Sequence, residues 1–160
     1  MRELKHLAFA VGYRKIGIVA LQYGKLHNWQ IAKAAYSNTS KLEALVNSLI
    51  DAHDPSVVVV ERTDGKCRKG DETQCRIVAI SEIAKARKRL VREVAREHDF
   101  ENKYEEAKAL VETYPELKSL VPKKVPCWKH EPRLMIMFEA LAMADQVMHE
   151  PAEKLAAAMG

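Results

Sequence analysis

Two glutamates lie in stretches of the sequence that are otherwise apolar, and carboxylates in such places are candidates for chemistry. Glu61 directly follows four consecutive valines, and Glu139 is the one polar residue of the segment 134–144. A helix that is apolar on every side is buried in its domain. An ionised carboxylate there costs on the order of several kcal/mol unless it is paired, protonated or bound to a metal. Both glutamates are therefore candidate catalytic residues. The alternatives are that Glu61 is only the first solvated residue after a strand, and that Glu139 reaches the domain edge or pairs with an arginine.

Asp145 is a less favoured candidate on the same segment. It follows Glu139 by six residues, which places it about 120° further around a helix of 3.6 residues per turn. The two carboxylates are thus not expected to face one cavity equally, and Asp145 fits the solvated end of the helix better.

The element that carries Glu61 follows from the valines. β-Branched side chains favour extended backbone, and a short run without polar residues is typical of a strand buried on both faces. In α/β folds, functional groups lie outside the carboxyl ends of such strands. Glu61 occupies that position, before a loop rich in turn residues.

Ahead of the valines, the sequence predicts three strands and a helix. Gly24 suits a tight hairpin, so the three strands should form an antiparallel meander. Ser40 and Glu43 have the spacing of a capping box at the start of the helix. The valine strand should then lie beside the first strand after a helical crossover. The predicted strands cover residues 4–11, 16–21 and 26–36, and the helix covers residues 41–53.

After the valine strand, the sequence predicts mainly helices. One begins near residues 71–73, and the apolar spacing of residues 90–95 favours its extension over a short strand at 90–94. Another helix is predicted over residues 101–114, and Pro132 suits the first position of a last helix that runs to about His149. We expect one domain over residues 1–150 and a short tail over 151–160.

Composition limits the classes of protein to consider. The chain has 160 residues, 30% of them charged, and a formal net charge of +4, which suits a globular domain with a tendency toward nucleic acid. Its three cysteines form no CxxC pair, so neither a disulfide framework nor a zinc site is indicated. No signal-peptide pattern or membrane-length apolar run is present. We expect a cytoplasmic protein.

Three motifs in this order resemble the RuvC-like branch of the RNase H-like superfamily, which contains the Holliday junction resolvases. The first strand of that family runs into Asp-Pro-Gly, and a second glycine opens the next strand; residues 10–19 keep both glycines, Gly12 and Gly17. The family's fourth strand ends in a glutamate, matched by Glu61. Its final helix carries Asp-Ala-Leu-Ala-x-Ala, matched by residues 139–144. The resemblance implies an α/β, RNase H-like fold with a mixed central sheet, in which three antiparallel strands and further parallel strands are flanked by helices.

What the resemblance implies about activity is metal-dependent, structure-selective cleavage of branched DNA. Glu61 and Glu139 would hold Mg²⁺ or Mn²⁺, hard cations that prefer oxygen ligands. The family's first aspartate, however, is replaced by Ala10, whose methyl group cannot bind a metal. We therefore expect a protein that binds its substrate and cleaves it poorly, and that gains metal-dependent cleavage in an Ala10→Asp variant. The intact surroundings of Ala10 favour a deliberate substitution over a naturally inactive nuclease.

Contacts to DNA phosphates are expected from basic residues near this site, and such contacts weaken with salt. A flexible, merely solvated loop is the alternative for most of them. A homodimer is expected by analogy, because resolvases act on two-fold junctions. The other functions considered are a non-catalytic nucleic-acid-binding module with this fold and a nuclease for RNA or RNA–DNA hybrids. The predicted DNA-binding residues are Arg14, Lys15, Arg62, Lys66, Arg68 and Lys69.

Overall fold

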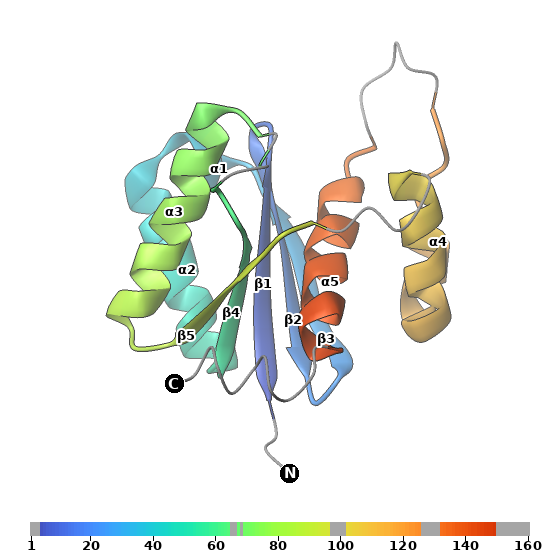
Figure 1. Ribbon diagram of the computed structural model, residues 1–160, viewed down its shortest axis with the longest axis horizontal. Coiled ribbons are helices and arrows are strands. Elements are labelled where there is room, and N and C mark those ends of the chain that lie inside the picture. Colours follow the sequence, from blue (N-terminus) through green and yellow to red (C-terminus); the bar gives the residue numbers. More distant parts are fainter. Residues whose placement is uncertain (1–3, 65–66, 68, 97–101, 126–131, 150–160) are drawn as a thin grey trace.

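A five-stranded mixed sheet forms the centre of the computed structural model, which describes residues 4–64, 67, 69–96, 102–125 and 132–149. The strand order is β3-β2-β1-β4-β5 (Figure 1). The first three strands pair antiparallel, and β4 and β5 run parallel to β1. The predicted meander, crossover and mixed sheet are therefore confirmed. The strands are β1 (Lys5–Gly12), β2 (Lys15–Gln22), β3 (Lys25–Ala32), β4 (Val57–Glu61) and β5 (Leu90–Val94).

Helices cover both faces of the sheet (Figure 1). On one face lie α2 and α3, and on the other lies α5, with α4 packed on its outer side. This arrangement buries both faces of β4, which explains why its residues read as an unbroken apolar run. The helices are α1 (Ala34–Ser37), α2 (Thr39–His53), α3 (Asp71–Ala86), α4 (Lys103–Thr113) and α5 (Met135–Met148), with a 3₁₀ helix, η1 (Pro115–Leu120).

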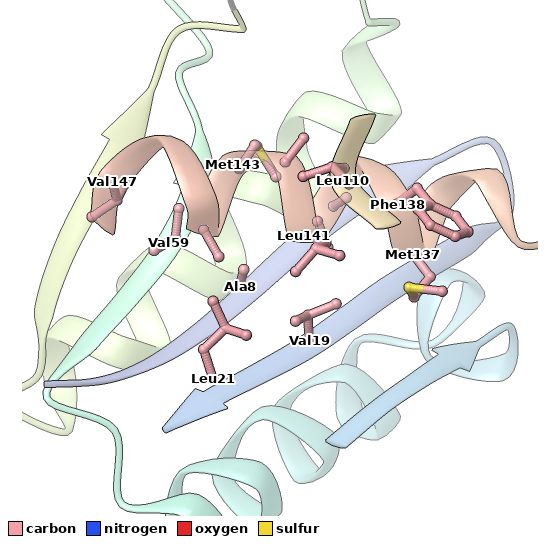
Figure 2. Packing of buried hydrophobic residues seen from close by; sticks show 14 of the residues in the cluster. Ala8, Val19, Leu21, Val59, Leu110, Met137, Phe138, Leu141, Met143 and Val147 are labelled. Carbon is pink, nitrogen blue, oxygen red and sulfur yellow. The ribbon is translucent and has the colours of Figure 1, made fainter. Parts of the chain in front are cut away.

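The core has two halves, one on each side of the sheet. Successive side chains of a strand point to opposite faces. Val58 and Val60 therefore pack toward α2 and α3, and Val57 and Val59 toward α5. Figure 2 shows the half under α5, where Leu141 lies over β2.

Helix α5 approaches the sheet most closely at Gly17 of β2. A Cβ atom built on Gly17 would lie 2.4 Å from the carbonyl oxygen of Ile136. Gly17 pairs with Ala10 across β1 and β2. Two of the smallest residues thus lie side by side beneath the first turn of α5.

Two details around the first crossover differ from the sequence prediction. Strand β3 ends at Ala32 and not at Tyr36, because the chain turns into α1 and Tyr36 is buried among the helices on the α2 face. The cap of α2 is Asn38, whose side chain accepts a hydrogen bond from the backbone N–H of Lys41 at 3.0 Å. The prediction of a Ser40–Glu43 capping box is therefore wrong, because the helix is capped by Asn38, two residues before Ser40.

The predicted helical extension over residues 90–95 is also wrong, because Leu90–Val94 form β5. Helix α3 ends at Ala86, and Lys88 follows with φ +59°, a left-handed conformation that stops a helix. The chain then pairs with the open edge of β4 over five residues. A local apolar pattern cannot reveal that edge, so pairing within the sheet decided the outcome.

The last two predicted helices are present with shorter bounds. Helix α4 begins at Lys103, where Asn102 caps its first turn, and α5 begins at Met135. Pro132 instead precedes the helix and accepts a hydrogen bond from the backbone N–H of Met135. The predicted tail over residues 151–160 lies outside the described residues. Within the part of the chain that the structure describes, no helix is long and apolar enough to cross a membrane.

Candidate functional site

Three elements bring the candidate residues together at one end of the sheet. Strands β1 and β4 pair in parallel with Ala8 opposite Val59. Two residues further along each strand lie Ala10 and Glu61, which by strand alternation face the same side, toward α5. Glu139 lies on α5, buried against that side. The two glutamates and Ala10, distant in sequence, therefore converge on one place.

Lys69 joins the two glutamates. Its ammonium nitrogen lies 2.8 Å from Oε1 of Glu139 and 3.5 Å from Oε1 of Glu61. It also donates a hydrogen bond to the backbone carbonyl of Val11, 2.6 Å away and directly after Ala10. The glutamate side chains are only 8% and 7% exposed, and the lysine side chain is 20% exposed. The centre of the site is thus a partly buried ammonium between two buried carboxylates.

The backbone around Lys69 is fixed by the start of α3. The side-chain amide of Gln74 donates to the carbonyl of Lys69 at 2.6 Å, and its backbone N–H donates to the carbonyl of Gly70. Cys67 adds a further contact, because its thiol donates to Oε2 of Glu61 at 3.2 Å. Both carboxylate oxygens of Glu61 therefore have partners within the protein.

Nearby positive charges keep the Glu139 carboxylate on α5 ionised. Burial alone would raise the pKa of Glu139, but the charge and hydrogen bond of Lys69, together with the charges of Lys103 and Arg96, more than offset burial. The result is a pKa below the usual value. Burial raises the pKa of the Cys67 thiol, which keeps it protonated as a hydrogen-bond donor. The site thus holds an ionised Glu139 and a neutral Cys67 thiol.

Asp145 makes its hydrogen bonds elsewhere on α5. The hydroxyl of Tyr114 donates to it at 3.1 Å, and burial raises the pKa of Tyr114 first of all, with the carboxylate adding to the effect. His149 lies one turn further on, with its ring 3.5 Å from the same carboxylate oxygen. Asp145 therefore ties α5 to the end of α4, while Glu139 enters the site.

A basic and aromatic rim lies beside the site, at the turn between β1 and β2. Tyr13 is 74% exposed, and the guanidinium of Arg14 lies 5.2 Å from the centre of its ring. Arg14 has φ +57°, an uncommon conformation for a residue other than glycine. Lys15 follows, half-buried, at the start of β2. This turn presents a cation and a flat apolar surface to solvent.

The loop after β4 contributes less free positive charge than its sequence indicates. Arg62 forms a two-pronged, exposed ion pair with Asp64. Lys69, predicted as a DNA contact, instead has its charge directed at the buried glutamates. Lys66 and Arg68 lie outside the described residues.

These residues do not fit a divalent cation as they stand. Mg²⁺ takes oxygen ligands in a near-ideal octahedron. Here the Oε1 atoms of both glutamates face the Lys69 ammonium. The residue of β1 on this side of the sheet is Ala10, which is buried and whose methyl group cannot bind a cation. Among the described residues, no cluster of three or more histidine, cysteine, aspartate or glutamate side chains could hold a metal ion. The predicted Mg²⁺ or Mn²⁺ therefore has no ligand set here.

The strand order and the crossover together define an RNase H-like fold. Comparison with solved structures agrees. The fold matches Thermus thermophilus RuvC in complex with a Holliday junction substrate with a TM-score of 0.57 and 16% identity, over 88% of this chain and 90% of that one. A further structure of Thermus thermophilus RuvC gives a TM-score of 0.53 at 14% identity, with the same coverage. The fowlpox virus Holliday junction resolvase gives 0.51 at 11% identity, over 90% of this chain and 97% of that one. No protein-family model and no curated protein sequence matches the chain.

The sequence analysis missed three features of the site: the position of Lys69, the thiol donor Cys67 and the exposed ring of Tyr13. A lysine in a glycine-rich loop is ordinarily solvated, so nothing in the local pattern marks Lys69 as buried. The sequence did give one indication of such a residue, because two buried glutamates require a positively charged partner. The arginine considered for Glu139 is replaced by this lysine.

Proposed function

We propose that this chain binds branched DNA at the end of the sheet where β1 and β4 finish and that, as it stands, it does not cleave the DNA. One observation supports the second half above all. The residue beside Glu61 that faces α5 is Ala10, which is fully buried and has no group able to bind a cation, a water or a proton. The carboxylate that a RuvC-like, metal-dependent nuclease would carry on its first strand is therefore missing.

The fold and the rim support the first half of the proposal. One solved structure with a similar fold, that of Thermus thermophilus RuvC, is a complex with a Holliday junction substrate. Next to the candidate site, the turn at Tyr13 and Arg14 offers a guanidinium for phosphate and an aromatic ring on which an unpaired base can stack. A net charge of +4 adds a long-range attraction for nucleic acid.

Gel shifts in a chelating buffer test binding without any contribution from metal. The probes are a four-way junction, a linear duplex and an RNA–DNA hybrid built from the same sequences. We expect the junction to bind most tightly. Equal affinity for junction and duplex would contradict structure selectivity and favour a general nucleic-acid-binding module. Preference for the hybrid would instead favour the RNA-directed class.

Incubation of the same junction with millimolar Mg²⁺ or Mn²⁺ tests the absence of cleavage. We expect intact strands on a denaturing gel after an incubation in which a known resolvase cuts to completion. Metal-dependent nicks that are absent from an Ala10→Val control would overturn this part of the proposal. Measuring the mass in solution, with and without junction, tests the expected homodimer.

A further inference from the structure

The centre of the acidic site is filled by a part of the protein itself. Nζ of Lys69 lies within 4 Å of a carboxylate oxygen on β4 and of another on α5, and it also donates to the carbonyl of Val11. These three oxygens come from the same three elements, β1, β4 and α5, that would build a cation site. The ammonium therefore stands where their oxygen atoms converge.

We propose that Lys69 is the resident cation of this site, so that Glu61 and Glu139 are held together without a divalent metal and do not act as metal ligands. An ammonium has three protons to donate and carries its charge at one point. It can thus hydrogen-bond to two converging carboxylates at once, although its single charge balances only one of them. The lysine is tethered to the chain, so it needs no free ligand to occupy the site.

Three observations indicate that the surrounding structure holds the Lys69 ammonium at this position. Its backbone is anchored by Gln74 on the first turn of α3. Its side chain is four-fifths buried. The remaining carboxylate oxygen of Glu61 accepts a hydrogen bond from the Cys67 thiol, so both oxygens of that glutamate have partners within the protein.

The inference changes what is expected of a restored carboxylate at position 10. An Ala10→Asp variant would add a third carboxylate beside Lys69, but the ammonium would still occupy the place where a metal ion would have to bind. This variant alone is therefore expected to stay inert toward junctions. A double variant, Ala10→Asp with Lys69→Met, removes the resident charge and is expected to bind Mn²⁺.

Titration of Mn²⁺, followed by its electron paramagnetic resonance signal and by thermal unfolding, tests the proposal. The wild-type protein should show no saturable Mn²⁺ binding and no rise in Tm. Lys69→Met should have a lower Tm without metal and should regain part of it as Mn²⁺ is added, while a Lys41→Met control on the exposed start of α2 behaves like wild type. Saturable binding to the wild-type protein with the affinity of Lys69→Met would overturn the proposal.

Amine labelling of the wild-type protein gives a second measurement if Lys69→Met fails to fold. Mass spectrometry compares the labelling rate of Lys69 with that of Lys41 in the native protein. We expect Lys69 to react many-fold more slowly, both with and without Mn²⁺. A rate equal to that of Lys41, or one that rises to it when Mn²⁺ is added, would refute a resident ammonium. Junction binding in chelator does not depend on either result, so the two proposals can fail separately.

Discussion

Gly17 is the position at which a single methyl group should disturb the packing that places the site. A Cβ atom there would lie 2.4 Å from the carbonyl oxygen and 2.6 Å from the carbonyl carbon of Ile136, and 2.9 Å from the backbone nitrogen of Met137. All three are backbone atoms of the chain entering α5, so no side-chain rotation can relieve the overlap. Helix α5 itself must move away from β2.

The size and sign of the effect of Gly17→Ala follow from two opposing contributions. In a strand without a clash, alanine is more stable than glycine by about 0.5–1 kcal/mol, because glycine loses more conformational freedom on folding. Overpacking of a rigid interior costs about 1–3 kcal/mol. We expect the clash to dominate, with a net cost of up to about 2.5 kcal/mol. At 2–4 °C per kcal/mol for a chain of this size, the Tm should fall by up to roughly 10 °C.

Gly12→Ala provides the matched control. A Cβ atom at Gly12 would lie 2.9 Å from Cδ1 of Ile136, the far end of a flexible side chain that can rotate away. Its Tm should therefore stay close to that of the wild-type protein or rise slightly. Thermal and urea unfolding of both variants measure the difference. A Gly17→Ala protein that is as stable as Gly12→Ala, or more stable than wild type, would refute the close approach of α5 to β2.

Three further predictions concern the ties around the site. Tyr114→Phe removes the hydroxyl that donates to Asp145 of α5, so the variant should lose about 1 kcal/mol of its free energy of unfolding in urea. Its affinity for junctions should be unchanged. Weakened DNA binding would place Asp145 in the interface. The lowered pKa of Glu139 means that its ionised form stabilises the fold above its ordinary pKa, and that this stability is lost as the pH falls through the lowered value. Glu139→Gln should flatten the acid side of the stability profile, an effect that Glu43→Gln on an exposed helix face should not produce. Arg14→Gln should weaken junction binding and lower the slope of log affinity against log salt by about 0.9, the value for one phosphate contact; an unchanged slope, as expected for Lys41→Gln, would remove Arg14 from the interface.

The central features of the fold followed from the sequence because they depend on local pattern. Four valines in a row predict a strand with two buried faces, and Gly24 predicts the hairpin between the second and third strands. The order of strands and helix then leaves few topologies, and the observed order of β1 to β4 is the one expected, while β5 was not predicted. The apolar segment around Glu139 likewise forms a helix buried along most of its length.

The tertiary structure alone decided where charges meet. Residues 90–94 became a strand because β4 has an open edge there, which no local spacing reveals. Lys69 has the surroundings of a solvated loop lysine in the sequence, and yet its ammonium lies buried between Glu61 and Glu139. The physical reason is that a buried charge is stabilised by partners far away in the chain, and their distance from it is set only when the sheet and its covering helix come together.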